Sequence, residues 1–193
     1  MSRLGLFTYY LEIITAGLIR GMITLIYIYN DFGGTHTTSL AAAYHLRKLP
    51  TNRVLTREEI LHVPYFNKLE KSDAGRIIFH GKDDEGNSVY TLGRRSSKLV
   101  VPALKNLCQI LEEQFQIDEK IIFSNTSPTV PFAMTMGGFF SRGLKIDFIG
   151  VPLLVAGAKK SCLNIYNLVQ NTKHIGSSTH SKVTVIENKN FQA

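Results

Sequence analysis

The sequence predicts one α/β domain, in which a mostly parallel sheet is flanked by helices in a three-layer, Rossmann-like arrangement. Short runs of β-branched and aromatic residues alternate with segments of helical period, as in chains built from βαβ units. The chain has 193 residues, of which 44% are hydrophobic, so one domain can enclose a sizeable core. Charged residues make up 19% and the mean hydropathy is +0.01, which excludes both a disordered chain and a polytopic membrane protein.

The first strand and the first helix have the clearest patterns. Residues Ile23–Tyr29 are almost continuously apolar, with β-branched and aromatic side chains, which predicts a strand buried on both faces. The segment Asn30–Gly34 ends this strand. A helix is expected from Thr37 to Lys48, where Pro50 prevents it from continuing.

A short helix and two strands are expected next. Thr56 and Glu59 have the spacing of a capping box, which predicts a helix that runs to about His62. Ile77–His80 predicts the second strand of the parallel sheet. A turn then leads into Val89–Leu92, which we expect to be an antiparallel addition.

The rest of the domain continues the alternation. The spacing of Leu104, Leu107, Cys108, Leu111 and Phe115 predicts a helix, which begins either at Lys98 after a Ser97 cap or with Pro102 at its first helical position. We expect further strands at Lys120–Ser124 and Lys145–Gly150, a helix at Pro131–Phe140 and a closing helix at Gly157–Asn171.

The apolar N-terminal segment, residues 1–21, is expected to lie outside the domain. Glu12 and Arg20 interrupt any stretch long enough to span a bilayer. Met22 directly precedes the first strand, so we favour translation from Met22, with residues 1–21 as an upstream extension. A weak amphipathic anchor and a signal peptide are the alternatives. The single domain is therefore expected over residues 22–173.

The polar segment at the other end, residues 174–193, shows no helical period, and we expect a disordered tail. Cys108 and Cys162 fall in apolar helical segments, so we expect buried thiols rather than a disulfide framework. Together with the poor match to a secretory signal, this pattern predicts a cytoplasmic protein.

The charge of the chain allows an anionic partner without identifying one. The formal net charge is +7, but the basic residues form no long run, so nucleic acid is not expected as a partner. Membrane contact is not expected either, apart from the weakly apolar N-terminal segment. The sequence leaves the oligomeric state open.

The candidate site follows from the position of the first strand. Ligands of an open parallel sheet bind beyond the carboxyl ends of its strands. After the first strand come Asn30, Asp31, Gly33, Gly34, Thr35, His36, Thr37 and Thr38. The two glycines allow a tight turn, and the start of the following helix offers free N–H groups to an anion. The alternative is that Thr35 or Thr37 only caps that helix.

Two histidines are candidates for the same site. His36 is the candidate proton-transfer group because imidazole titrates near neutral pH, with a capping or surface role as the alternative. His80 ends the second predicted strand and is a candidate ligand-binding residue, with a core role as the alternative. The sequence has no diagnostic metal-ligand spacing, so no metal site is predicted, and the cofactor stays unknown.

Two more polar segments are candidates for ligand binding. One is the cluster Arg94, Arg95, Ser96, Ser97 and Lys98, whose cations and hydroxyls suit a phosphate or a carboxylate. The other follows a later strand and consists of Asn125, Thr126 and Ser127. A solvated turn is the alternative for each of them.

These features predict a protein that binds a small anionic ligand, such as a nucleotide or a phosphorylated metabolite, at the Gly-Gly-Thr-His turn. The alternative is a non-enzymatic protein-interaction or regulatory module. Whether the protein catalyses a reaction is left open by the sequence.

Several segments, taken in order, carry a resemblance to a known family: Tyr29–His36, Ser39–Leu46, Leu49–Thr51, Ile77–Gly81, Phe139–Arg142 and Ile149–Pro152. Over residues 22–173 the chain resembles uncharacterised bacterial proteins of the domain of unknown function family 3189, from spore-forming Gram-positive bacteria. Members of that family often carry Cys-Tyr-Gly-Gly where this chain has Asn30–Gly34, so thiol chemistry is not expected at the turn. The resemblance implies the domain boundaries but no established activity.

Overall fold

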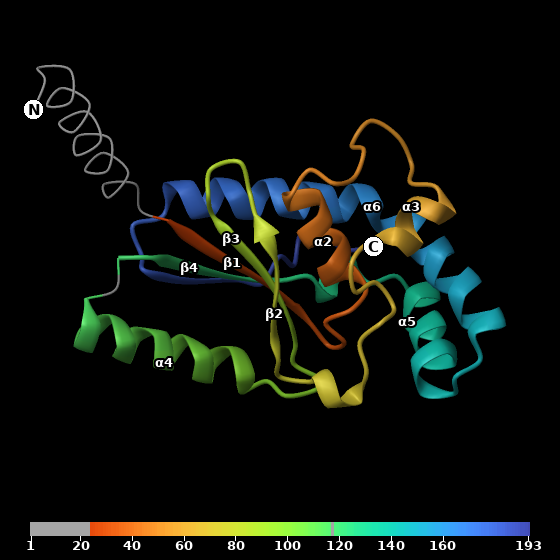
Figure 1. Cartoon of the computed structure of the whole chain (residues 1–193), viewed down its shortest axis with the longest axis horizontal. Coiled ribbons are helices and arrows are strands. Elements are labelled where there is room, and N and C mark those ends of the chain that lie inside the picture. Colours follow the sequence, from red (N-terminus) through yellow and green to blue (C-terminus); the bar gives the residue numbers. More distant parts are fainter. Residues whose placement is uncertain (1–23, 117) are drawn as a thin grey trace, which may run out of the picture.

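The computed structural model describes residues 24–116 and 118–193 (Figure 1). The expectations for residues 1–21 therefore lie outside the described residues. The described chain forms a five-stranded sheet in the order β2-β3-β1-β4-β5. The strands are β1 (Leu25–Asp31), β2 (Ile77–Lys82), β3 (Ser88–Gly93), β4 (Lys120–Asn125) and β5 (Val183–Ile186). All neighbouring strands are parallel except β2, which runs antiparallel to β3.

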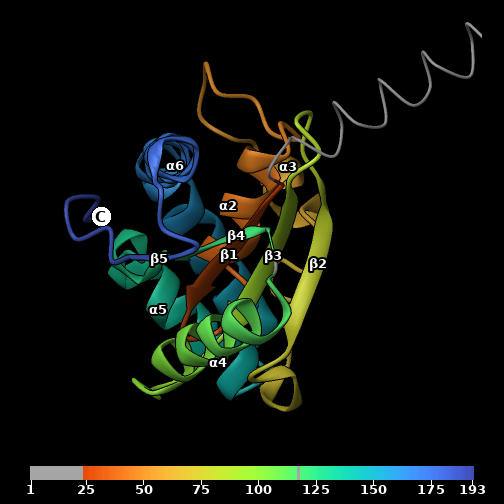
Figure 2. The same cartoon turned by 90° about the vertical axis from the view of Figure 1, so that its left-hand side faces the viewer.

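Helices cover both faces of this sheet. They are α2 (Thr37–His45), α3 (Arg57–His62), α4 (Val100–Phe115), α5 (Phe132–Gly138) and α6 (Asp147–Ser178). Short 3-10 turns form η1 (Lys71–Asp73) and η2 (Ser127–Thr129), and a π-helical turn forms η3 (Phe139–Gly143). Figures 1 and 2 show α4 on one side of the sheet and α2 with α6 on the other. The prediction of a mostly parallel sheet with flanking helices is confirmed.

The larger part of the core lies between the sheet and the pair α2–α6. Tyr27 and Tyr29 of β1 pack there with Ile122 of β4, against the alanines of α2 and the buried side chains of α6. Three consecutive alanines, Ala41–Ala43, allow α2 to lie close to both the sheet and α6. This tight packing fixes the position of the first turn of α2 relative to the end of β1.

A smaller cluster lies on the other face, beneath α4. Ile28, Leu92 and Phe123 from the three central strands pack there with Val101, and Leu104 and Cys108 of α4 cover them. Alternate residues of β1 therefore belong to different clusters, as expected for a strand buried on both faces.

The directions of two strands differ from the prediction. We expected Ile77–His80 in the parallel sheet and Val89–Leu92 as the antiparallel addition. In the structure β3 pairs with β1 in parallel, and β2 is the antiparallel edge strand. A hairpin requires the two strands to be antiparallel to each other, but it does not determine which of them is parallel to β1.

The predicted strand Lys145–Gly150 is wrong, because α6 begins at Asp147. A short apolar run fits a buried strand or a buried helix equally well. Packing decides in favour of the helix: a Cβ added to Gly150 would lie 2.6 Å from the backbone nitrogen of Ser141, so the absence of a side chain allows α6 to cross η3 closely. The closing helix is accordingly longer than predicted, extending from Asp147 to Ser178.

The expectation of a disordered tail is also wrong. Residues up to Ser178 continue α6, and Val183–Ile186 forms β5, parallel to β4. The four residues are β-branched, but they lie in a polar context, and only the long-range pairing with β4 makes them a strand.

The long helix α6 satisfies the length and composition criteria for a membrane span. Its buried side chains, among them Leu154, Ile165 and Leu168, lie in the core against α2 and the sheet. Burial of this kind explains the apolar composition of α6 without a membrane.

Candidate functional site

The carboxylate of Asp31 organises the glycine-rich turn after β1. It accepts hydrogen bonds from the backbone N–H of Gly34 and from the hydroxyl of Thr37, the latter at 2.7 Å. The hydroxyl of Thr37 also lies 2.9 Å from that of Thr126, which follows β4. These hydrogen bonds connect the ends of the neighbouring strands β1 and β4 to the start of α2, and both Asp31 and Thr37 are buried. An incoming ligand would find these groups already paired.

The two glycines of the turn differ in what they do. Gly34 has a φ of +71°, and a Cβ added to it would lie 2.6 Å from the backbone nitrogen of Gly93. The turn therefore packs directly against the end of β3, which only a glycine permits. A Cβ added to Gly33 would meet only the side chain of Thr35, at 3.7 Å, although the carbonyl oxygen of Gly33 lies 2.7 Å from the position of a Cβ added to Gly93.

Thr35 holds a neighbouring loop against the turn. Its hydroxyl donates to the carbonyl of Tyr65 and accepts from the N–H groups of Lys68 and Leu69. The carbonyl of Thr35 accepts from the N–H of Asn67. The loop over residues 65–69 thereby lies beside the start of α2, a contact that no local pattern in the sequence predicts.

The first turn of α2 is left without a side-chain cap. His36 occupies the N-cap position, but its side chain accepts no hydrogen bond from the helix, and the first turn contains no acidic residue. The hydroxyls of Thr38 and Ser39 are fully buried and have no hydrogen-bond partner within the described residues. Buried hydroxyls are normally paired, so these two are exceptions at the start of α2.

The amide of Asn30 is the third buried group of this kind at the same edge. Its Oδ1 accepts from the Nε of Arg94 at 3.3 Å, while its Nδ2 is unpartnered within the described part of the chain. Arg94 also donates to the hydroxyl of Ser127 at 3.1 Å. Its guanidinium thus lies between the ends of β1 and β4, where both of these hydrogen-bond acceptors are uncharged.

Arg94 and Arg95 reach this edge because β3 is parallel to β1. Their backbone N–H groups donate to the carbonyls of Asp31 and Phe32. The guanidinium of Arg95 donates to the carbonyl of Glu70 at 3.0 Å and lies over the ring of Phe32. Arg95 also has a φ of +53°, an uncommon backbone conformation for a residue with a side chain.

The remaining residues predicted for the site have other surroundings. Ser97 accepts from the N–H of Leu99 just before α4, and Ser96 and Lys98 are exposed in the same turn. Asn125 donates to the carboxylate of Glu187 and accepts from the N–H of Ser127. None of these contacts is with the first turn of α2.

His80 does not lie at the predicted edge. Because β2 is antiparallel to the other strands, its C-terminal end points away from the ends of β1, β3 and β4. The Nε2 of His80 pairs with the hydroxyl of Thr91 at 2.9 Å, and its ring packs on that of Tyr65. Burial lowers the pKa of His80 to about 4, with the charge of Lys48 acting in the same direction. These contacts are those of a structural side chain.

His36 is the histidine that lies at the site. Its Nε2 is 3.2 Å from the Oδ1 of Asn67, and its ring packs edge-on against Phe66. Burial lowers the pKa of His36 below its usual range, and the charge of Arg142 acts in the same direction, whereas Asn67 and Asp31 oppose the shift. The imidazole is therefore mainly neutral near pH 7.

A chain of polar groups continues from His36 to the start of α6. The Nδ2 of Asn67 donates to the hydroxyl of Ser141 at 2.8 Å, and this hydroxyl donates to the carboxylate of Asp147. Arg142 lies 3.6 Å from the same carboxylate, and its buried Nε has no partner within the described residues. Ser141 and Arg142 belong to the π-helical turn η3, a conformation often found at functional sites.

Sequence reasoning missed Asn67, Ser141, Arg142 and Asp147. The polar pair Ser141-Arg142 inside an apolar segment was the available signal. Its connection to His36 depends on the loop over residues 65–69 and on the crossing of η3 with α6, both of which are tertiary features.

Two surface hollows lie away from this site. One is beside α6 and is lined by Tyr44, Thr51, Asn52, Arg53, Val54, Cys162, Leu163 and Tyr166. The other lies at the C-terminal end of α4 and is lined by Glu112, Glu113, Gln116, Asp118 and Lys182. Among the described residues no group of three or more histidine, cysteine or acidic side chains could hold a metal ion.

Comparison with known proteins identifies the family. The family described as protein of unknown function (DUF3189) matches residues 26–174, which include the sheet through β4, the first turn of α2 and the chain from His36 to Asp147. Neither the curated proteins nor the solved structures that were compared gave a match. The match extends over most of the chain, and the protein therefore belongs to the DUF3189 family.

Proposed function

We propose that the protein binds a small anionic ligand at the first turn of α2. The observation that carries the proposal is the set of buried polar groups at one helix start: the uncapped N–H groups of α2 and the unpartnered hydroxyls of Thr38 and Ser39. Unpaired buried hydroxyls cost about 1–3 kcal/mol each, so a ligand that pairs with them recovers this free energy. The N-terminal end of a helix also favours negative charge.

The charges around the helix start restrict where the anion binds. The carboxylate of Asp31 already occupies the N–H of Gly34 and the hydroxyl of Thr37, and it would repel an anion on that side. The charge of Arg142, a residue of η3, lowers the pKa of His36, so this cation lies near the N-cap of α2. We therefore place the anion between the first turn of α2 and η3, away from the position that the glycine-rich turn alone predicted.

A phosphate group suits these partners best. Its oxygens accept hydrogen bonds from several N–H and O–H donors at once, and a guanidinium can pair with it. A nucleotide or a phosphorylated metabolite is accordingly the proposed ligand. The helices on both faces of the sheet support a three-layer, Rossmann-like class, in which ligands bind at this edge. Two free cysteines support a cytoplasmic location.

The test is thermal unfolding of the full chain against inorganic phosphate, pyrophosphate, nucleotides and sugar phosphates. A ligand present at about 100 times its dissociation constant stabilises the folded state by about 2.7 kcal/mol, which raises the melting temperature measurably. We expect Ser39→Ala and His36→Ala to fold and to reduce the shift. Ser177→Ala removes an exposed hydroxyl near the C-terminal end of α6. It is the matched control and should keep the full shift in melting temperature.

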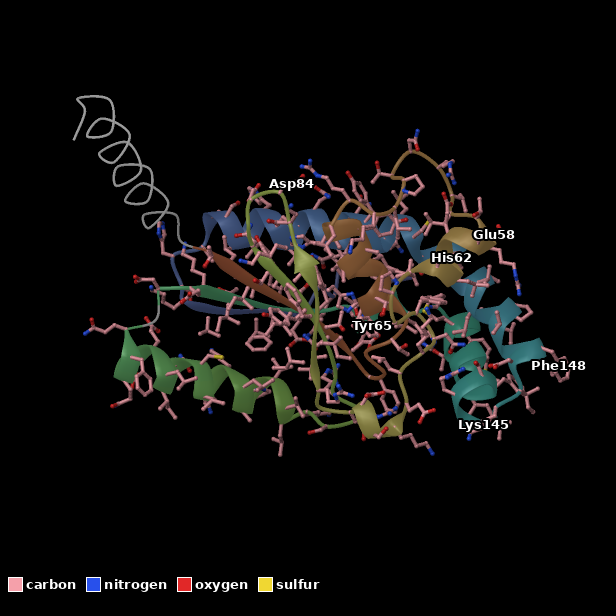
Figure 3. The ribbon with its side chains drawn as sticks, in the orientation of Figure 1. Glu58, His62, Tyr65, Asp84, Lys145 and Phe148 are labelled. Carbon is pink, nitrogen blue, oxygen red and sulfur yellow. The ribbon has the colours of Figure 1, made fainter. Side chains whose placement is uncertain are left out.

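A second candidate function is protein interaction. The side chains of Phe132, Phe139 and Phe148 are exposed at the end of the molecule formed by α5, η3 and the start of α6. Figure 3 shows Phe148 pointing outward there, near Lys145. The thermal assay separates the two functions: a shift that Ser39→Ala leaves unchanged, or no shift with any anion, would contradict the anion site and favour the interaction module.

A further inference from the structure

The chain of hydrogen bonds from His36 to Asp147 has only one possible direction. A carboxylate only accepts, so the hydroxyl proton of Ser141 must be the one donated to Asp147. The oxygen of Ser141 then only accepts, from Asn67 at 2.8 Å and from Arg142 at 3.4 Å. Its single proton and both of its lone pairs are thereby used.

The direction at Ser141 determines the protonation of His36. Because Asn67 must donate its Nδ2 to Ser141, its Oδ1 is the atom that lies 3.2 Å from the imidazole. An amide oxygen only accepts, so the Nε2 of His36 carries the proton. In the neutral ring the other nitrogen, Nδ1, is left with a lone pair and no proton.

His45, a buried histidine of α2, forms hydrogen bonds with both of its ring nitrogens and serves as a comparison for His36. The Nε2 of His45 donates to the carboxylate of Asp83 at 3.0 Å, which fixes the same tautomer. Its Nδ1 is 2.7 Å from the hydroxyl of Tyr29, which must therefore be the donor. In His45 both nitrogens are paired, and the residue is structural.

His36 lacks the second partner that His45 has. No hydrogen bond is formed by its Nδ1 in the described part of the chain, and this atom is not among the fully enclosed unpartnered atoms, so it retains some access to solvent. The nearest groups include Gly138 of α5: a Cβ added to this glycine would lie 3.7 Å from Nδ1. As the N-cap of α2, His36 also lies directly beside the proposed anion position.

We infer that the Nδ1 of His36 is a hydrogen-bond acceptor for the ligand, and that the ligand is a phosphate monoester with a hydroxyl group close to its phosphate. The inference rests on the proposed function, because it requires an anion at the first turn of α2. A neutral imidazole with its proton on Nε2 can pair at Nδ1 only with a donor, and a fully ionised phosphate oxygen is an acceptor. A neighbouring hydroxyl supplies the donor. Asn67, Ser141 and Asp147 are positioning residues that fix the tautomer.

The tautomer is tested without any ligand. The two ring nitrogens of a neutral imidazole give well-separated ¹⁵N resonances in long-range ¹H–¹⁵N spectra, so the protonated nitrogen of His36 can be identified. We expect the Nε2–H tautomer in the natural protein and a mixture in Asp147→Asn, because an amide can donate as well as accept. Asp84→Asn, at the tip of the β2–β3 hairpin in Figure 3, is the matched control and should leave the spectrum of His36 unchanged. A proton on Nδ1 in the natural protein would overturn the inference.

The ligand class is tested by calorimetry with a matched pair of probes, methyl phosphate and 2-hydroxyethyl phosphate. The hydroxyl should tighten binding about threefold to tenfold, the value of one neutral hydrogen bond. His36→Ala should remove this difference while methyl phosphate still binds. Equal affinities of the two probes for the natural protein would overturn the inference but leave the proposed function standing. Failure of both probes to bind would overturn the proposed function and this inference with it.

Gly138→Ala provides a second variant that leaves the imidazole in place. The added methyl group would lie 3.3 Å from the Cε1 of His36 and 3.7 Å from its Nδ1, so it partly covers the acceptor. Gly138 has ordinary helical backbone angles, and the substitution is compatible with the fold. We expect the advantage of 2-hydroxyethyl phosphate to fall by more than half. An undiminished advantage would show that the hydroxyl pairs elsewhere and would contradict the inference.

Discussion

Gly34 and Gly93 approach each other backbone to backbone where β1 and β3 end. A Cβ added to Gly34 would lie 2.6 Å from the backbone nitrogen of Gly93, and a Cβ added to Gly93 would lie 2.7 Å from the carbonyl oxygen of Gly33. Gly34 also has a φ of +71°, which residues with side chains adopt only with strain. The close approach brings the turn after β1 up against Gly93, the residue before Arg94, so it shapes the edge at which the candidate site lies.

We therefore predict that Gly34→Ala lowers the free energy of unfolding by about 2–4 kcal/mol, the sum of backbone strain and overlap with main-chain atoms that cannot move aside. Gly86→Ala separates the two contributions. Gly86 has a φ of +82° but nothing within 4 Å of an added Cβ, so only the strain, about 1 kcal/mol, is expected. Urea denaturation of the two variants measures the difference, and equal losses would show that the contact with Gly93 contributes nothing.

The sequence predicted the parts of the fold that local patterns determine. β1, α2, α3 and β4 were expected within a few residues of their observed bounds, because each has a strong apolar period or a capping signal. The capping box at Thr56 and Glu59 is present with both of its hydrogen bonds. These features depend on residues that are neighbours along the chain.

The errors arose where distant contacts decide the structure. The apolar run at Lys145–Gly150 became helix because Gly137 and Gly150 let α6 cross α5 and η3 closely. Val183–Ile186 became a strand only because β4 offers an unpaired edge. Distant contacts also explain what was missed at the candidate site. The turn after β1 is a local feature and was predicted, but the connection of His36 through Asn67 to Ser141 was not, because it joins residues more than 30 positions apart.

The buried hydroxyl of Thr38 leads to a prediction about stability. Thr38→Val replaces the unpartnered hydroxyl by a methyl group of similar shape, so the free energy of unfolding should stay unchanged or rise by up to about 1 kcal/mol. Anion binding should weaken at the same time. Thr172→Val is the matched control, because its equally buried hydroxyl bonds to Ser124 and to the carbonyl of Leu168. That variant should lose about 1–2 kcal/mol in chemical denaturation.

An equal loss in Thr38→Val and Thr172→Val would contradict the assignment. It would show that the hydroxyl of Thr38 stabilises the fold through a hydrogen-bond partner. The anion site would then lose its main support, which is the set of unpartnered hydroxyls at the start of α2. Stability gained together with binding lost is the signature of a residue kept for a ligand rather than for the fold.

The segment after β5 should contribute measurably to the free energy of unfolding. Asn188 follows β5, and its Nδ2 donates to the hydroxyl of Ser124 at 2.8 Å and to the carbonyl of Asn125 at 3.1 Å. Its φ is +54°. Asn188→Ala should lose about 2–3 kcal/mol in urea denaturation, because it removes both hydrogen bonds and leaves a strained backbone.

Asn188→Gly removes the same hydrogen bonds without the strain, so it should be about 1 kcal/mol more stable than Asn188→Ala. The exposed neighbour Asn190 is the control, and Asn190→Ala should have no effect within about 0.5 kcal/mol. A loss below that limit in Asn188→Ala would favour the disordered tail that the sequence predicted.

His45 should make the protein less stable in acid. Burial lowers its pKa to about 4, with the charge of Lys173 in the same direction and Asp83 opposing, while Tyr27 and Tyr29 face the ring from β1. In the unfolded chain a histidine takes up a proton near pH 6.5. Between about pH 6.5 and 4 the unfolded state therefore binds more protons, and stability falls as the pH falls, by about 3 kcal/mol for this residue.

Unfolding by urea at several pH values measures this loss. Burial also lowers the pKa of His80 to about 4 and that of His36 below its usual range, so the three histidines must be distinguished by substitution. His45→Gln should reduce the pH dependence by about one proton near pH 5, even though it also destabilises the fold. If His45→Gln retained the full dependence, the ring of His45 would have to be charged in the folded protein, and the direction assigned to its bond with Tyr29 would be wrong.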